Sequence, residues 1–182
     1  MSDLFSHAEP DRIRNATNAM RGTAADDAAT GAPEATTAMV VVPAARERAW
    51  EGFTDNVHLW WPAENTHFGA PTHAELTETS MGEENDAGDE HEWACVVRTD
   101  QQREIELSWT LGWDKSSPSR VRVTFDDNSL DGSAVGTKVT VVHDDWGSGP
   151  EGEKQAKAFN GWSSALSSYA RFMGSDPSGG KH

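Results

Sequence analysis

The longest regular pattern of apolar and polar positions lies near the end of the chain, in residues 148–174. Apolar or small side chains recur there every three or four residues, which is the period of an amphipathic helix. The positions on this face are Ala156, Phe159, Trp162, Ser163, Leu166, Tyr169, Ala170 and Met173. Pro150 suits the first helical turn, and Gly174 suits a left-handed end. The pattern predicts one long helix that needs a large apolar partner.

Residues 105–111 alternate strictly between apolar and polar side chains, which is the period of a strand. The apolar positions are Ile105, Leu107, Trp109 and Leu111. The same alternation marks residues 120–125 and 138–142, and residues 126–136 between them have the composition of a turn. Alternation of this kind is typical of antiparallel strands with one covered face.

The first part of the folded region adds one strand and two short helices. Residues 36–42 are a β-branched run that Pro43 ends, and residues 44–54 have a helical period. Residues 57–61 allow another helical turn before Pro62. Two further strands are predicted within residues 74–99, at 74–79 and 92–99. The fold class is therefore α+β, a curved antiparallel β-sheet that grips a long C-terminal α-helix.

The apolar periodicity is confined to residues 36–173, which predicts one domain over that range. Residues 1–35 are rich in Ala, Asp, Thr and Gly and hold few large apolar side chains, so we expect a disordered acidic, Ala-rich extension. Residues 174–182 are a Gly, Ser and Pro segment, for which we expect a disordered tail.

Composition narrows the range of partners. The 182 residues carry a formal net charge of -15, which opposes binding to nucleic acid and to anionic membranes. Cys95 is the only cysteine, which excludes an intrachain disulfide and a cysteine-based zinc site. The chain lacks a secretory signal pattern and an apolar run near twenty residues. We expect a cytoplasmic protein that binds neither nucleic acid nor membrane.

Several short motifs in this order resemble one known group of proteins. Residues 40–55 match the pattern V-V-V-P-A-x-x-E-x-x-W-x-x-F-T-D. The remaining motifs are Trp60-Trp61-Pro62, Ser108-Trp109, Gly136-Thr137 and Gly161-Trp162. Together they resemble the START-like (SRPBCC) helix-grip superfamily, and most closely its branch named after the activator of the heat-shock-protein-90 ATPase.

The resemblance covers about residues 36–173. It implies a six- or seven-stranded sheet wrapped around the last helix. It also implies a cavity between the sheet and the helix, which in many relatives holds an apolar or amphipathic small molecule.

Aromatic side chains are the main candidates for contact with such a ligand. The chain has eight tryptophans, and an indole supplies both apolar area and an N–H donor. We select Trp61, Trp109, Phe159 and Trp162, which lie on the covered face, on the last helix or near the expected mouth. Core packing is the competing interpretation for each, and Trp50 is assigned to the core outright.

His143 continues the inward phase of Val139 and Val141 and is the fifth candidate. It could orient a polar ligand group or act as a base, and a structural hydrogen bond to Asp144 or Asp145 is the alternative. No histidine spacing fits a metal site, and no cofactor motif or catalytic constellation is present. Cys95 is expected to be a small core residue.

The remaining polar groups carry less information. Carboxylate pairs such as Glu83-Glu84 are expected in exposed turns, where solvation accounts for them.

These observations leave three functional hypotheses. The first is non-enzymatic binding of a small apolar or amphipathic ligand between the sheet and the last helix. The second is a chaperone-cofactor-like or regulatory module that binds a protein partner. The third and weakest is a cyclase- or hydrolase-type enzyme with His143 as its base.

Overall fold

The computed structural model describes residues 31–130 and 134–175. Most of the predicted extension and tail therefore lies outside the described residues. The helices and strands are β1 (Thr36–Val42), α1 (Arg46–Thr54), α2 (Val57–Trp60), a 3₁₀ turn (Ala63–Asn65), β2 (Thr72–Leu76), β3 (Ser80–Asn85), β4 (Glu90–Asp100), β5 (Glu104–Trp109), β6 (Ser119–Leu130), β7 (Ala134–Asp144), α3 (Gly149–Ala158) and α4 (Trp162–Phe172).

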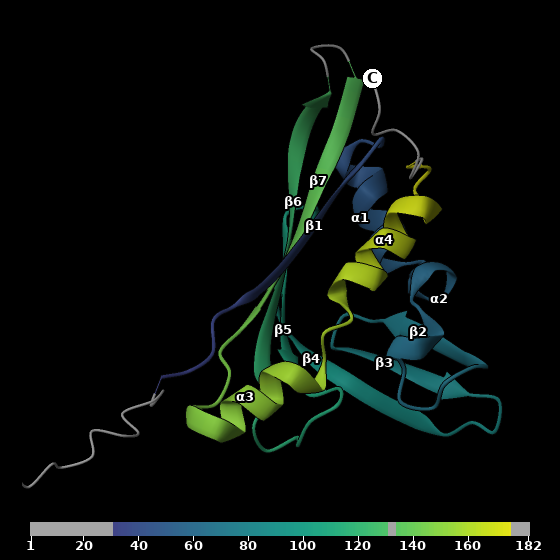
Figure 1. The fold of residues 1–182 in the computed structure, drawn as a ribbon. Coiled ribbons are helices and arrows are strands. Elements are labelled where there is room, and N and C mark those ends of the chain that lie inside the picture. The colour runs from purple at the N-terminus through teal and green to yellow at the C-terminus, as the bar shows by residue number, and fades with distance from the viewer. Residues whose placement is uncertain (1–30, 131–133, 176–182) are drawn as a thin grey trace, which may run out of the picture.

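The seven strands form one antiparallel sheet in the order β1-β7-β6-β5-β4-β3-β2. The sheet is curved, and α1, α2 and α4 lie on its concave side (Figure 1). This arrangement confirms the predicted α+β fold class, a curved antiparallel sheet that grips C-terminal helical structure.

The core fills the space between the sheet and α4. The strands contribute residues from the alternating segments, among them Val121, Val123, Val139 and Val141, all with 0% exposure. Burial of each such side chain is worth roughly 1.5–3 kcal/mol. On α4, Tyr169 is fully buried and donates a hydrogen bond of 2.6 Å to the carbonyl of Ala49 in α1. The helix that the sheet grips is thus also tied to α1.

The C-terminal helical region differs from the prediction of one continuous helix. Its limits are close to those expected, but the helix is interrupted between α3 and α4. Phe159 has extended backbone angles, φ -135° and ψ 114°. At Gly161, a Cβ atom would lie 2.5 Å from the Asn65 side chain, which donates a hydrogen bond of 3.1 Å to the Gly161 carbonyl. Close packing against Asn65 and burial of the Phe159 ring therefore replace continuous helical hydrogen bonding here.

A β-bulge in β4 explains a second difference. Met81 pairs with Ala94 but Gly82 pairs with Glu92, so Trp93 is an extra residue on β4. An extra residue reverses the faces of all the residues that follow it. Trp93 and Ala94 are both buried, whereas Cys95 is exposed. The prediction of Cys95 as a core residue was therefore wrong.

The β6–β7 hairpin is longer than predicted. Residues 126–136 were expected to form a turn, but strand pairing continues to Leu130 and Ala134. Polar pairs extend this arm beyond the alternating apolar segment. One of them, Asp126 opposite Lys138, forms an ion pair of 3.7 Å.

Candidate functional site

The five side chains predicted to contact a ligand lie together in one aromatic cluster beneath α4. They are Trp61, Trp109, His143, Phe159 and Trp162, and none is more than 8% exposed. The ring of Trp109 lies 5.0 Å from that of Trp162 and 5.1 Å from that of Phe159, centroid to centroid. Trp61 lies 5.6 Å from Trp162. Residues from four separate parts of the chain thus share one interior.

Two tryptophans that were not predicted as site residues complete this cluster. Trp93 stacks on Trp61 at 4.9 Å, and Trp146 lies 4.0 Å from the His143 ring. The rings pack against one another rather than around an empty centre. The interior that the resemblance assigned to a ligand is therefore closed by aromatic side chains.

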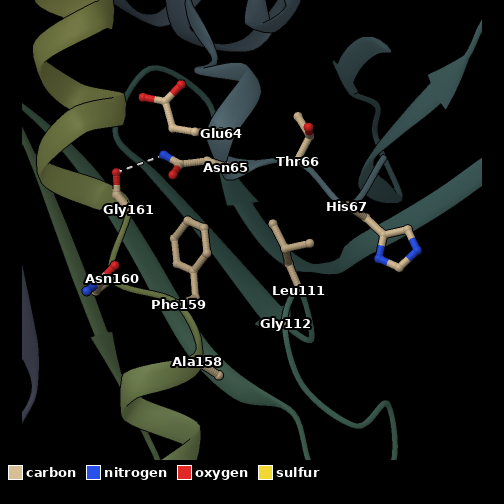
Figure 2. A pocket seen from close by; sticks show the side chains of 10 residues that line it. All are labelled: Glu64, Asn65, Thr66, His67, Leu111, Gly112, Ala158, Phe159, Asn160 and Gly161. Carbon is tan, nitrogen blue, oxygen red and sulfur yellow. Dashed lines mark hydrogen bonds between the residues drawn. The ribbon is translucent and has the colours of Figure 1, made fainter. Parts of the chain in front are cut away.

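A hollow of about 300 Å³ lies directly outside the cluster, at the break between α3 and α4. Figure 2 shows its lining, in which Phe159, between α3 and α4, and Leu111, after β5, project into the hollow. Asn65 and His67 contribute polar atoms from the segment that follows α2. Phe159 belongs to both the hollow and the cluster, so it forms the wall between them.

His143 lies at the centre of a chain of hydrogen bonds that crosses the cluster. Trp162 Nε1 lies 3.1 Å from His143 Nδ1, and His143 Nε2 lies 2.8 Å from Ser119 Oγ. An indole N–H can only donate, so Nδ1 accepts and the proton of the neutral ring is on Nε2. Ser119 then donates in turn to the Trp109 carbonyl at 3.4 Å.

This environment holds His143 neutral. Burial lowers its pKa from 6.5 to about 3, against a smaller opposing effect of Asp144. Both ring nitrogens are engaged in hydrogen bonds, and the side chain is 0% exposed. A general base needs an accessible lone pair within reach of its substrate. The geometry therefore favours a structural role for His143, with Ser119 and Trp162 as its partners in place of the expected Asp144 or Asp145.

Trp109 carries the one buried side-chain polar atom without a hydrogen-bond partner among the described residues, its Nε1. The side chain is 1% exposed and packs against Phe159. A buried donor without an acceptor costs about 1–3 kcal/mol. The cluster therefore contains an unused N–H, on a ring that packs against Phe159, the wall of the hollow.

Glu83 is a buried carboxylate that the sequence interpretation missed. It was expected in an exposed turn, but it lies on β3 and is only 3% exposed. Its oxygens accept hydrogen bonds from the backbone N–H of His67, the hydroxyl of Thr72 and Nε1 of Trp93, at 2.5, 2.8 and 2.8 Å. Glu83 therefore orients Trp93 and fixes the loop that borders the hollow. Met81 lies two residues earlier and therefore on the same face of the strand, and this was the sequence feature that could have indicated burial of Glu83.

Two histidines lie beside this carboxylate, His67 from the lining of the hollow and His91 from β4, where it pairs with Glu83. His67 stacks on His91 with a centroid distance of 3.8 Å. Burial lowers the pKa of His91, and repulsion from His67 lowers it further, while Glu83 acts in the opposite direction. Within the described ranges, no group of three His, Cys, Asp or Glu side chains converges as a metal site would require.

A seven-stranded antiparallel sheet curved around C-terminal helices and an aromatic interior defines a START-like helix-grip domain. The chain belongs to the family described as Activator of Hsp90 ATPase homolog 1-like protein, whose model matches residues 43–174. This confirms the branch inferred from the sequence motifs. A comparison with curated proteins gives no match. None of the helices that the structure describes is long and apolar enough to cross a membrane.

Solved structures share this fold at low sequence identity. CalC, a self-sacrificing resistance protein from Micromonospora echinospora, is 24% identical with a TM-score of 0.54, over 76% of this chain and 93% of CalC. XoxI from Bacillus cereus is 17% identical with a TM-score of 0.52, over 78% and 96% of the two chains. The Hsp90 activator PFC0360w from Plasmodium falciparum is 16% identical with a TM-score of 0.50, over 78% and 97%.

Proposed function

We propose that the chain is a non-enzymatic binding protein for a small apolar or amphipathic molecule that carries a hydrogen-bond acceptor. The observation that carries the proposal is the unpartnered Nε1 of Trp109 among the described residues, on a ring that packs against Phe159, which lines the hollow. The ligand enters from the hollow, displaces the Phe159 ring and accepts a hydrogen bond from Trp109. The binding surface comprises Trp61, Trp109, His143, Phe159 and Trp162.

The helix break supports this role for Phe159. Because residues 159–161 lie outside both helices, the Phe159 ring can move without unwinding α3 or α4. Ligand pockets combine aromatic walls with a few polar groups that fix orientation. The tryptophan rings supply such walls, and the Trp109 N–H and the Asn65 amide supply such polar groups.

The state of His143 supports binding without chemical conversion. Its lone pair accepts from Trp162, and its proton is donated to Ser119, so neither is free to act on a ligand. The ring instead holds Trp162 in position at the side of the cluster.

The test compares two probes that differ in one acceptor, naphthalene and naphthaldehyde. We expect the aldehyde to bind more tightly by about three- to tenfold, which corresponds to one neutral hydrogen bond. Trp109→Phe removes the donor, so the preference should disappear. Trp113→Phe is the control, because Trp113 is absent from the contacts of the cluster. An unchanged preference in folded Trp109→Phe would exclude Trp109 as the donor.

Mass spectrometry of protein purified from its host, native and then denatured, identifies a natural ligand. A stoichiometric compound released on unfolding would support the proposal and give the chemical class. Absence of a released compound, together with no binding of either probe, would favour a closed interior and a different function.

A second candidate function is activation of a partner ATPase of the Hsp90 kind. It is favoured by the family match and by the exposed apolar side chains Leu59 and Phe172, which are 57% and 38% exposed. They border a hollow of about 520 Å³ between α2 and α4. The test measures the ATPase rate of the host's Hsp90 with the whole chain, with Leu59→Ser and with a chain that lacks residues 1–35. A rate that the chain leaves unchanged would exclude this function.

A further inference from the structure

A second groove lies away from the aromatic cluster, at the other end of the concave face. It has a volume of about 770 Å³, within the range of sites for small organic ligands. Its apolar floor is formed by Trp50, Leu76, Val96 and Ile105, and the neutral polar lining residues are Thr54, Thr77, Thr99 and Gln101. Trp50 is only half-buried, and its ring packs on that of Phe125 at a centroid distance of 5.1 Å. The assignment of Trp50 to the core was therefore only partly correct.

The rim of this groove carries negative charge without compensation. Asp55 and Glu78 line it, and none of the lining residues that the structure describes is Lys or Arg. Within residues 31–130 and 134–175, neither carboxylate forms an ion pair with a basic side chain. Two carboxylates above an apolar floor match a ligand that has an apolar body and a positive charge.

The position of Asp55 at the end of α1 makes the negative potential at this rim stronger. Asp55 is the C-cap of α1, and α1 has no basic residue in its last turn. The C-terminal end of a helix carries a partial negative charge, so a carboxylate there is unfavourable unless a cation is nearby. A bound cation would relieve this repulsion.

The turn between β2 and β3 fixes the backbone position of Glu78, the second residue with a carboxylate at the rim. Thr77 accepts a hydrogen bond of 3.0 Å from the backbone N–H of Ser80, and its own N–H donates to the Ser80 carbonyl at 2.8 Å. Glu78 lies within this closed turn between β2 and β3, so its backbone is fixed at the rim. The charge is therefore presented without a cost of ordering the loop.

We infer that this groove is a second binding site, specific for a small amphipathic cation, an amine or quaternary ammonium on an aliphatic or aromatic body. The ammonium lies between Asp55 and Glu78 and over the exposed part of Trp50, where a cation–π contact adds to the attraction. The body covers Leu76, Val96 and Ile105. The site shares no lining residue with the aromatic cluster, so it is independent of the function proposed above.

Titration calorimetry with octyltrimethylammonium and octanoate tests this inference, because the two probes have similar bodies and opposite charge. We expect the cation to bind and octanoate to bind at least tenfold more weakly. Asp55→Asn and Glu78→Gln should each weaken the cation by about two- to fivefold, as for exposed ion pairs. Trp50→Leu should weaken it by a similar factor.

Two control variants separate binding in this groove from binding elsewhere on the chain. Asp86→Asn removes one exposed charge from the β3–β4 turn, away from the groove, and should leave affinity unchanged. Phe159→Ala alters the aromatic cluster and should also leave it unchanged. Equal binding of octanoate and the cation would overturn the inference. So would equal losses in Asp55→Asn and Asp86→Asn, since that result would reflect net charge alone.

Discussion

Single polar side chains hold the aromatic interior together. Trp162 on α4, His143 on β7, Ser119 on β6 and the Trp109 carbonyl on β5 form one continuous chain of hydrogen bonds. Each group is buried, so each bond forms in a medium of low dielectric constant, where a lost partner is costly. Correct docking of α4 therefore depends on His143 remaining neutral.

This dependence predicts a loss of stability in mild acid. The unfolded chain binds a proton at His143 near pH 6.5, while the folded protein does so only near pH 3. The contribution of neutral His143 is complete above pH 6.5 and is lost as the pH falls toward 3, at about 1.4 kcal/mol per pH unit. Urea unfolding at a series of pH values measures it.

The variant His143→Gln isolates this effect from the titration of carboxylates. The wild-type protein should be more stable than the variant at neutral pH, and the difference should shrink steadily below about pH 6. A difference that does not vary with pH would show that His143 does not titrate as the buried geometry requires.

Glu83 gives a second prediction at this scale. Glu83→Ala leaves the Trp93 indole N–H and the His67 backbone N–H without their acceptor, while the Thr72 hydroxyl keeps the Glu84 carbonyl at 3.1 Å. We expect a loss of about 3 kcal/mol in the free energy of unfolding, since each unpaired buried donor costs about 1–3 kcal/mol. Glu84→Ala, at the exposed neighbouring position, should change stability by less than about 0.5 kcal/mol. Equal effects of the two substitutions would contradict the anchoring role of Glu83.

For single residues, the sequence predicted the direction of a side chain correctly where the alternation of a strand decides which face it lies on. The inward direction of His143 follows from its phase with Val139 and Val141. The partners Ser119 and Asn65 could not be predicted, because each meets the site from a distant part of the chain. Glu83 was missed because charged residues are rarely buried, and burial here depends on donors that only the fold assembles.

At the level of elements, the break between α3 and α4 is specified by tertiary packing. Gly161 has φ -78°, a value open to any residue, so backbone conformation alone does not require glycine. The requirement comes from the Asn65 side chain, which occupies the position of a Cβ atom. Apolar periodicity continues through the break, and the dipeptide Asn160-Gly161, which is typical of turns, was the sign of it in the sequence.

This packing predicts a coupled pair of substitutions. Gly161→Ala should destabilise the fold by about 1–3 kcal/mol, because the new methyl group overlaps Asn65. Asn65→Ala should cost about 1–2 kcal/mol through its lost hydrogen bonds to Gly161 and Ser164. In the double variant the overlap is gone, so the combined loss should be smaller than the sum. Additive losses in thermal or urea unfolding would exclude this contact as the cause.

The bulge in β4 marks a second limit of prediction for elements. Residues 92–99 were correctly predicted as a strand, and β4 spans Glu90–Asp100. One extra residue at Trp93 nevertheless moves Cys95 to the convex face. A bulge depends on pairing with β3, where a Cβ atom on Gly82 would lie 2.8 Å from the His91 carbonyl oxygen. The alternation of apolar and polar residues within β4 alone does not reveal this close contact between the two strands.

For the whole molecule, apolar periodicity and motif order were sufficient to predict the helix-grip fold. The acidic residues of the molecule, in contrast, outnumber the basic residues that could neutralise them in the fold. The chain has 30 acidic and 15 basic residues, and the ion pairs of the described part are mostly exposed. Exposed pairs contribute little to stability, whereas net charge far from zero destabilises a compact state through repulsion.

Repulsion across the surface predicts that salt stabilises this protein. Added KCl shortens the screening length to about 10 Å at 0.1 M, which weakens repulsion between carboxylates more than it weakens the few attractive pairs. The melting temperature should therefore rise between low and physiological ionic strength. A charge-reversed variant, Asp86→Lys, should melt higher at low salt and respond less to KCl, while Asp86→Ala should lie between it and the natural chain. A melting temperature that is constant or falls with KCl would mean that attraction within the ion pairs offsets the repulsion between carboxylates in the folded state. The cation preference inferred for the groove at Asp55 and Glu78 would then lack its long-range support.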